Sequence, residues 1–299
     1  MSMTESRYIS WLEKKGTALF RAAGTCWTLY HGALVPASPF PDYHDLNPGE
    51  ARSLLKASGA WFIRYSRDPC NHETPWWYVV CDHYDPATIN AKTRQNIRRG
   101  RRECAVREVD ATWLADHGYP CYAAAFVRYG GRRPLSEGGF QKMILDTREG
   151  PFSYWGVFHE GHLAGYCQCI VDGGQVSTNV TKYHPSYLRH RSAYALIDAL
   201  IQTYAVGRGM TLSNGNRSIA HGTNYQDVLE NLGFRRQFCR LAVVYNPWLE
   251  LCMDALYPLR PILKRLPDRH VIHEIGALIR QEEIRRAKPG PAVQLSPRT

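Results

Sequence analysis

The hydrophobic pattern of the second half of the chain predicts three strands followed by a helix. From residue 152 onward, apolar and polar positions alternate as they do in strands, with two glycine-containing turns between the runs. The three runs are FSYWGVFHE, LAGYCQCIV and QVSTNVTKY. The step Asp172-Gly173-Gly174 between the last two is typical of a β-hairpin. We therefore expect a three-stranded meander over residues 152–183.

The following segment has the spacing of an amphipathic helix. Its apolar residues recur at i, i+3, i+4, i+7 and i+8, and they are Ala193, Leu196, Ile197, Leu200 and Ile201. After it we expect a short strand MTLSN, a helix NYQDVLENLGF that ends at Gly233, and a last strand RRQFCRLAVVY. The predicted order from residue 152 is thus strand, strand, strand, helix, strand, helix, strand.

The first 84 residues also mix helix and strand patterns. A short helix is expected near Tyr8–Lys15, and Asn47 or Pro48 opens a second helix after a proline-rich loop. The strand-like runs around that second helix are TALFRA, TCWTLYHGALV, GAWFIRYS and PWWYVVCDHY. Together with the second half, these elements predict a mixed α/β protein.

A basic helix is expected over residues 85–103, beginning near Asp85. Its cationic residues are Lys92, Arg94, Arg98, Arg99, Arg101 and Arg102. Helical patterns then cover DATWLADHGYPCYAAAFVRYG and SEGGFQKMILDTREG, the second beginning at Ser136. Two more helices, Pro247–Leu266 and His270–Ala287, precede a proline-rich tail that we expect to be frayed.

From the composition we expect a large hydrophobic core and a cytoplasmic location. The chain has 299 residues, of which 44% are hydrophobic. No run approaches the ~18 apolar residues of a membrane span, and MSMTESRYISWLEKK lacks the apolar core of a signal peptide. The nine cysteines are scattered without a CxxC pair, so reduced thiols are expected. Cys167 and Cys169 should share one face of their strand.

The net charge of +10 indicates either a polyanionic partner or a positive surface that serves only solubility. One segment of the sequence favours a polyanionic partner. Arg189, His190, Arg191 and Ser192 gather at the start of the amphipathic helix, where the backbone N–H groups of the first turn have no partner in the helix. Helix starts of this kind attract anions.

The element order and the ENLGF stretch resemble the acyltransferase fold of the GNAT superfamily. The segment TRQNIRRGRRECAVREV, which follows a pair of strands, is similar to the FemAB-like branch, in which a basic helix joins two GNAT-like halves. The resemblance covers residues 59–245. It implies a degenerate first half over residues 1–110 with the basic helix, an acyltransferase half over 111–246, and a helical appendage with a frayed tail over 247–299.

Two departures from the GNAT pattern bear on the acyl donor. GNAT enzymes that use acetyl-CoA carry a Q/R-x-x-G-x-G/A loop at the helix start, whereas here Ser192 and Tyr194 stand at the glycine positions after Arg189. Those enzymes often use a tyrosine as general acid where this chain has Leu229. Both departures are typical of the FemAB-like branch, whose best-known members transfer an amino acid from aminoacyl-tRNA to an amine.

The resemblance therefore implies an N-acyltransferase that moves an aminoacyl group from aminoacyl-tRNA to the amine of a small-molecule or peptide-like acceptor. No cofactor or metal beyond the co-substrate is expected, and neither a membrane nor DNA is an expected partner. Two alternatives stay open: the same transfer from an acyl-CoA donor, and a noncatalytic RNA-binding module with the same fold.

Amide formation needs a polarised carbonyl and a group that removes a proton from the amine. In the GNAT arrangement a backbone N–H of the strand before the cofactor helix, here VSTNVTKY, polarises the carbonyl. The candidates for the catalytic groups are His184, Tyr183 and Asn214. The candidates for donor binding are Arg189, Arg191, Ser192, Arg98, Arg99 and Arg102. The candidates for acceptor binding are Asn179, Asn216 and His221.

Each of these assignments has an alternative in which the residue has only a structural role or lies on the solvated surface. A lone histidine in a polar loop is commonly a surface residue, asparagines build turns, and a basic helix can be a solvated face. Other chemistries lack support in the sequence. Cys70-Asn71-His72-Glu73 and Cys81-Asp82-His83 have no second pair at zinc-finger spacing, and neither a G-x-S-x-G nor a G-x-x-x-x-G-K-[ST] motif is present. Trp76, Trp77 and Tyr78 could stack on bases, but a strand with alternating core positions is the preferred interpretation.

Overall fold

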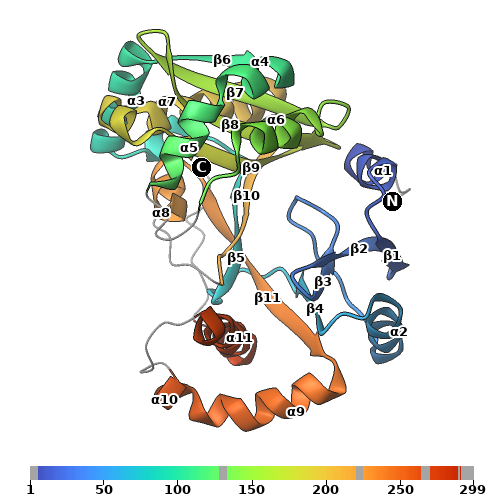
Figure 1. Cartoon of the computed structure of the whole chain (residues 1–299). Coiled ribbons are helices and arrows are strands. Elements are labelled where there is room, and N and C mark those ends of the chain that lie inside the picture. The colour runs from blue at the N-terminus through green and yellow to red at the C-terminus, as the bar shows by residue number, and fades with distance from the viewer. Residues whose placement is uncertain (1–5, 128–132, 220–224, 264–269, 289, 291–299) are drawn as a thin grey trace. The chain divides into compact units, whose positions relative to one another are not determined.

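The computed structural model describes residues 6–127, 133–219, 225–263, 270–288 and 290 (Figure 1). The chain forms two compact units, neither of which is continuous in sequence. The first unit comprises Met1–Trp11, Val79–Gly215 and Tyr225–Arg235, and the second comprises Leu12–Tyr78, Asn216–Asn224 and Arg236–Thr299. None of the helices in the described ranges has the length and apolar composition needed to cross a membrane.

The sheet of the first unit has the strand order β10-β9-β8-β7-β6. Its strands are β6 (Ala105–Val109), β7 (Phe152–His159), β8 (His162–Asp172), β9 (Gln175–Tyr183) and β10 (Thr211–Asn216). Strands β6 to β9 pair antiparallel, whereas β10 pairs parallel with β9. Gly173 and Gly174 turn the chain between β8 and β9 at φ of 54° and 81°, a conformation that costs glycine little. The predicted meander is therefore confirmed.

Helices cover both faces of this sheet. On one face, α4 (Ala111–His117), α5 (Tyr119–Phe126) and α6 (Glu137–Leu145) pack on a core formed by Leu114, Cys121, Tyr122, Phe140, Ile144, Tyr154 and Tyr166. Helix α7 (Ser192–Leu200) contacts β6, β7 and β8 and continues as a π-helical turn, Ile201–Val206. The Tyr204 hydroxyl of that turn bonds to Ser153. Because Ser153 and Tyr154 are neighbours in β7, they face opposite sides, so the α7 segment covers the second face.

The second unit contains the strand order β1-β2-β3-β4-β11. These strands are β1 (Leu19–Ala22), β2 (Thr25–Tyr30), β3 (Ala33–Pro36), β4 (Phe62–Arg67) and β11 (Arg235–Tyr245). Helix α2 (Pro48–Ser58) opens at Asn47 and Pro48, as the sequence predicted, and the Asn47 side chain forms a capping box with Glu50. The core of the second unit is formed by Trp27, Leu34, Leu46, Leu54, Leu55, Ile63 and Tyr65. Helices α9 (Pro247–Leu256), α10 (Arg260–Leu263) and α11 (His270–Arg286) complete this unit. The single helix predicted over Pro247–Leu266 is therefore wrong, because a 3-10 turn, Tyr257–Leu259, separates α9 from α10.

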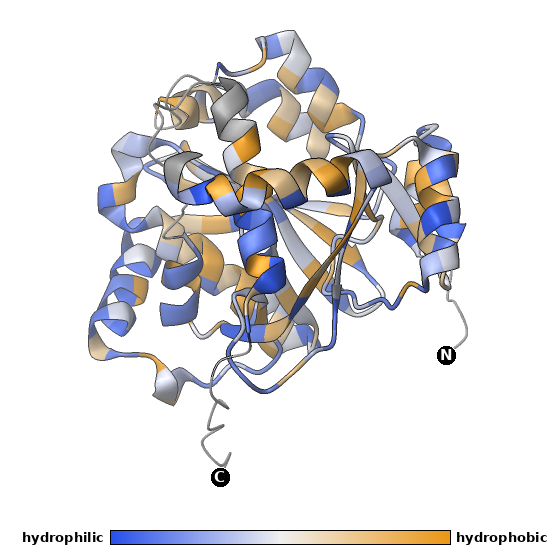
Figure 2. Ribbon diagram, turned by 90° about the horizontal axis from the view of Figure 1, so that it is seen from below, coloured by the Kyte–Doolittle hydropathy of each residue, from blue (hydrophilic) through white to orange (hydrophobic). Residues whose placement is uncertain are grey.

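Most predicted elements are present at their expected positions. Helix α1 (Arg7–Lys14), strand β5 (Trp76–Cys81) and helix α8 (Tyr225–Asn231) agree with the sequence pattern. In β5, Trp76 and Tyr78 are buried and Trp77 is half-buried, which confirms the predicted alternation. Figure 2 shows hydrophobic residues (orange) along the strands and mixed orange and blue residues along the helices.

Other details of the pattern were not predicted correctly either. The run TCWTLYHGALV is two strands, β2 and β3, because His31 and Gly32 turn the chain at φ of 49° and 76°. The basic helix does not begin near Asp85. That residue caps a short 3-10 turn, and α3 (Ala91–Glu103) begins at Asn90, whose side chain accepts the Thr93 N–H. Strand β6 was missed because a five-residue edge strand with charged positions has a weak alternating signal.

Candidate functional site

Strands β9 and β10 separate soon after they meet. Their parallel pairing covers only Thr211 with Gln175, Leu212 with Val176, and Ser213 with Ser177. Strand β9 then continues to Tyr183 paired with β8 alone. Because successive N–H groups of a strand point to alternate sides, some N–H groups beyond Ser177 face the side that β10 has left. The two strands therefore form a fork that opens after Ser177 and Ser213.

Side chains fix the point at which the fork opens. The buried Thr178 hydroxyl donates to the Ser213 carbonyl at 3.1 Å and accepts from Asn214 Nδ2 at 2.6 Å. Asn214 also donates weakly to the Thr178 carbonyl at 3.4 Å. The predicted catalytic candidate Asn214 therefore lies at the fork, but its amide is already engaged with β9. It can orient a substrate, and as an amide it cannot act as a base.

A β-bulge distorts β9 immediately beyond this point. The register with β8 shifts so that Thr178 pairs with Cys169 and Val180 pairs with Gln168, which leaves Asn179 as the extra residue. Asn179 is exposed, and its Nδ2 donates to Gln168 Oε1 at 2.8 Å. Bulges increase local twist and redirect side chains. The predicted acceptor residue Asn179 thus stands on a distorted segment at the fork.

The start of α7 leaves its backbone donors without a side-chain cap. The chain passes from β9 through a 3-10 turn, Pro185–His190, into Arg191, which has φ of 62°. The Arg191 carbonyl accepts the Ala195 N–H, and no side chain caps the helix. The buried Ser192 hydroxyl donates to the Tyr187 carbonyl instead. The first-turn N–H groups and their partial positive charge are therefore available to an anion.

The basic helix α3 packs directly against this helix start. A Cβ atom on Gly100 would lie 2.8 Å from the Arg191 carbonyl oxygen, so only glycine permits the observed approach. One helical position further on, Arg101 binds the buried Asp198 of α7 through two hydrogen bonds, of 2.6 and 2.9 Å. The Cys104 thiol donates to the His190 carbonyl. These contacts place the last turn of α3 beside the entrance of α7.

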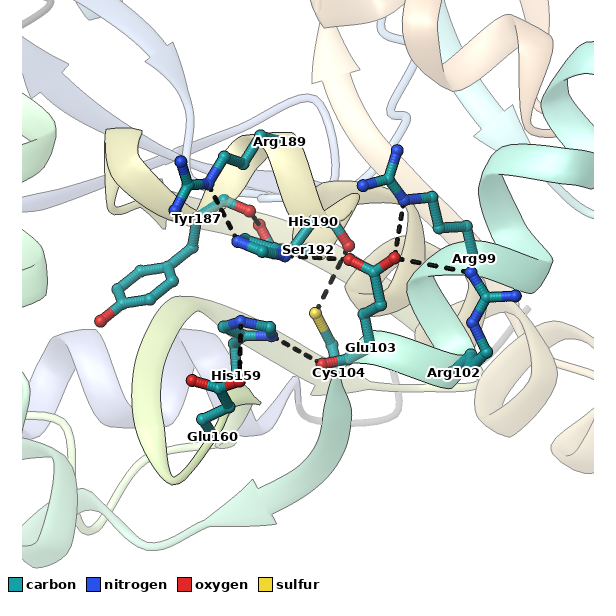
Figure 3. A network of polar contacts seen from close by, with 10 residues as sticks. All are labelled: Arg99, Arg102, Glu103, Cys104, His159, Glu160, Tyr187, Arg189, His190 and Ser192. Atoms are coloured by element: carbon teal, nitrogen blue, oxygen red, sulfur yellow. Dashed lines mark hydrogen bonds and ion pairs between the residues drawn. The ribbon is translucent and has the colours of Figure 1, made fainter.

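Glu103 connects α3 with the turn before α7 (Figure 3). Its carboxylate accepts from Arg99 Nε at 2.7 Å and from His190 Nδ1 at 2.9 Å. These hydrogen bonds, first that of Arg99 and then that of His190, lower the pKa of Glu103 from 4.5 to about 2. The carboxylate therefore stays charged at any physiological pH.

Two stacked histidines complete the network in Figure 3. The rings of His159 and His190 lie 3.8 Å apart, and His159 Nδ1 donates to the Glu103 carbonyl at 2.8 Å. Arg189 Nε donates to His190 Nε2 at 3.0 Å. In this arrangement Nε2 of His190 accepts and Nδ1 donates, so the two contacts orient the ring between Arg189 and Glu103. The chain Arg189, His190, Glu103 and Arg99 thus holds one cation on each side of a single carboxylate.

The predicted donor-binding arginines differ in how they are held. Arg98 and Arg189 are exposed, and Arg102 is 76% exposed at 3.6 Å from Glu103. Arg99 is committed to Glu103. Arg191 is half-buried, and its Nε has no hydrogen-bond partner among the described residues. A buried guanidinium nitrogen without a partner is costly, which is consistent with a ligand that completes it.

His184 and Tyr183 lie at the end of β9, yet neither has the geometry of a ready base. His184 caps the 3-10 turn by accepting the Ser186 N–H at Nδ1, at 3.3 Å, so the neutral ring carries its proton on Nε2. The Tyr183 hydroxyl is buried, and burial and the neighbouring Tyr225 raise its pKa well above the usual value. Tyr183 is therefore a stable proton donor, and His184 must release Ser186 before it accepts a proton.

Two candidates for acceptor binding remain. Asn216 is the exposed last residue of β10, and His221 lies outside the described residues. Within the described ranges, no three histidine, cysteine or acidic side chains are placed to hold a metal ion. Cys167 and Cys169 are fully buried with sulfur atoms 3.8 Å apart, which confirms that they share a face. Leu229, also fully buried, provides no acid.

Sequence reasoning missed Thr178, Glu103 and His159. The i, i+4 spacing of Arg99 and Glu103 was a readable signal for an ion pair on α3. The Thr178 hydroxyl and the His159 ring act across strands and turns that are distant in sequence, and no local spacing indicates such contacts.

Comparison with solved structures shows what this geometry resembles. No family model and no curated protein matches the sequence. The C-terminal domain of an Agrobacterium fabrum protein assigned as a lysylphosphatidylglycerol synthetase has a TM-score of 0.55 at 11% identity, covering 84% of this chain and 94% of that one. L-PGS from Bacillus licheniformis has a TM-score of 0.51 at 12% identity, covering 85% and 95%.

FemX is similar to the same degree. Its TM-score is 0.53 at 9% identity, and the match covers 82% of this chain and 92% of FemX. At such identities the likeness concerns the fold alone. The match extends over both units, which confirms the predicted GNAT fold.

Proposed function

We propose that this protein transfers an aminoacyl group from aminoacyl-tRNA to the amine of a small-molecule or peptide-like acceptor. The observation that carries the proposal is the fork between β9 and β10, whose longer arm leads into the uncapped start of α7. The fold that it shares with FemX and L-PGS supports acyl transfer as the reaction class.

The fork supplies the electrostatic part of the reaction. The donor ester carbonyl lies against β9 beyond Ser177, where N–H groups have no β10 partner. These donors stabilise the negative charge that develops on the carbonyl oxygen as the amine attacks. The new C–N bond forms, the C–O bond to the tRNA ribose breaks, and the leaving ribose oxygen takes up a proton.

The α7 entrance holds the phosphates of the donor. Its first-turn N–H groups and the cations Arg189 and Arg191 provide both backbone and side-chain contacts. A glycine loop closes around one pyrophosphate, and Tyr194 stands where such a loop needs its last small residue. Long arginines reach several phosphates of an RNA acceptor end. Exposed Arg98 and Arg102 of α3 extend the same positive surface.

His184 removes the amine proton in this proposal, and Asn179 and Asn214 position the acceptor. The proton enters at Nδ1 of His184, which displaces the Ser186 N–H at the moment of reaction. The buried hydroxyl of Tyr183 stays protonated, because burial raises its pKa. Asn216 and His221 remain predicted acceptor residues.

A donor experiment tests the proposal. The protein is incubated with labelled aminoacyl-tRNA, or with labelled acyl-CoA donors, together with a panel of amines. Amide product from aminoacyl-tRNA that disappears after RNase treatment is the expected result. RNase-resistant product from acyl-CoA assigns the donor to CoA and overturns the proposed donor. RNA binding with steep salt dependence and no amide from either donor class identifies a noncatalytic module.

A further inference from the structure

The second unit contains a pocket of 480 Å³ where β4 and β11 meet the last turn of α11. Four cationic residues line it, and they are Arg67, Arg240, Arg285 and Lys288. None of its lining residues is acidic. Its volume falls in the range of small-molecule sites. The charge of the lining therefore points to an anionic occupant.

Two of these cations face each other across neighbouring strands. Arg67 and Arg240 are directly opposite in the antiparallel register of β4 and β11, where like charges are destabilising. Among the described residues, the ion-pair partner of Arg67 is the exposed Asp68, at 3.3 Å. Among the described residues, no carboxylate lies within ion-pair distance of Arg240 or Lys288. An anion bound beside Arg67 and Arg240 would relieve the repulsion between these two cations.

The third cation is held in place by the unit itself. Glu282 is fully buried and accepts from Arg285 through Nε at 2.8 Å and Nη2 at 2.5 Å. Tyr245 donates to the same carboxylate at 3.0 Å. Arg286 also donates to Glu282 and pairs with Asp254 at 2.9 Å, so two carboxylates face the two guanidinium groups and Arg285 is fixed in place.

Apolar side chains form the rest of the pocket wall. Trp76 and Tyr65 are 3% and 5% exposed, and Leu241 and Val243 of β11 are also buried. Buried aromatic walls are rigid and suit the non-ionic part of a small ligand. We propose that this pocket binds a small phosphorylated molecule, with the lining cations Arg240 and Lys288 as the charged contacts of its phosphate. This inference does not depend on the donor or on the acyl-transfer reaction.

Calorimetric titration of the full-length protein with inorganic pyrophosphate tests the inference. We expect saturable binding that Arg240→Ala and Lys288→Ala each weaken about tenfold or more, because each removes a charged donor. The control Arg52→Ala/Lys56→Ala removes two exposed cations of α2 that do not line the pocket, and its binding should be unchanged. Citrate serves as the probe for a polycarboxylate.

Ligand-free stability gives a second readout. Arg240→Ala should raise the melting temperature slightly, because it removes the cation opposite Arg67, while pyrophosphate binding falls. Equal pyrophosphate binding by the wild type and both pocket variants overturns the inference. Citrate binding without pyrophosphate binding overturns the phosphate assignment. If an RNA oligonucleotide binds in a way that depends on Arg240 and Lys288, and pyrophosphate does not bind, the small-ligand assignment is also overturned. Aminoacyl transfer should be unchanged in Arg240→Ala, so failure of either proposal can be recognised separately.

Discussion

Glu103 is the residue on which the polar network beside α7 converges. It accepts from one arginine of its own helix and from a histidine 87 positions later in the sequence. Its charge fixes His190, which in turn accepts from Arg189. A candidate phosphate ligand is thereby positioned by a carboxylate that it does not touch.

The pKa of Glu103 predicts a pH dependence of stability. A carboxyl whose pKa falls from 4.5 to about 2 on folding stabilises the protein above pH 4.5, and this contribution is lost as pH falls toward 2. Denaturant unfolding of the wild type and of Glu103→Gln should show the wild type more stable at pH 7. The difference in free energy of unfolding between the two proteins should decrease steadily as the pH falls below 4.5. Parallel curves across that range would contradict the role given to the carboxylate.

Arg191 combines a strained backbone with a partly buried cation. Its φ of 62° favours glycine, so Arg191→Gly should raise the free energy of unfolding by about 1 kcal/mol. The same variant loses a charged contact and should raise KM for aminoacyl-tRNA about tenfold or more. Arg191→Lys keeps both the strain and the charge, and it should lie near the wild type in stability. A glycine variant with unchanged kinetics would remove Arg191 from the donor site.

Among elements, the fork depends on one hydroxyl. Thr178→Val keeps the shape but leaves the Ser213 carbonyl and the Asn214 amide without their partner, at a cost of about 1–3 kcal/mol. We expect slower amide formation in Thr178→Val and recovery in Thr178→Ser, measured under single-turnover conditions. Equal rates for the valine variant and the wild type would show that the spacing of β9 and β10 does not matter for the reaction.

The contact of α3 with α7 makes a second prediction at this scale. Gly100→Ala places a Cβ 2.8 Å from a backbone carbonyl oxygen and should destabilise the protein by about 1–3 kcal/mol. The matched change Gly138→Ala in α6 meets no atom within 4 Å and should stabilise by up to about 1 kcal/mol. Urea unfolding of both variants separates the two effects. Effects of the same sign and size would mean that α3 is not closely packed on α7.

The elements that the sequence predicted well are those with a strong local pattern. The β8–β9 hairpin follows from Gly173 and Gly174, and α2 follows from the Asn47 cap. The start of α3 was placed wrongly because both Asp85 and Asn90 are good capping residues, and the first one caps only a 3-10 turn. The capping preference of a residue cannot show which of two nearby caps, Asp85 or Asn90, opens the longer helix, because packing decides this.

For the whole molecule, the order of elements was predictable and the contacts between distant segments were not. The order from β7 to β11 was sufficient to indicate the GNAT fold. The candidate site, however, depends on pairs such as Arg101 and Asp198, which lie 97 positions apart. Glycine at position 100 makes that approach possible, and in the sequence it looks like an ordinary break in a basic helix. The positive charge of the basic helix is therefore partly neutralised by Glu103 and Asp198, and a count of charges along the sequence does not show this.

The measurement that tests the central claim most directly is the single-turnover rate of label transfer from aminoacyl-tRNA to an amine acceptor. Three proteins are compared: the wild type, Arg189→Ala/Arg191→Ala, and the control Arg208→Ala, which removes an exposed arginine beside Tyr204. The account predicts equal rates for wild type and control, and a loss of about 100-fold or more in the double variant, because two charged contacts are removed. Equal rates in all three proteins, or no amide product from the wild type with any aminoacyl-tRNA, would contradict it.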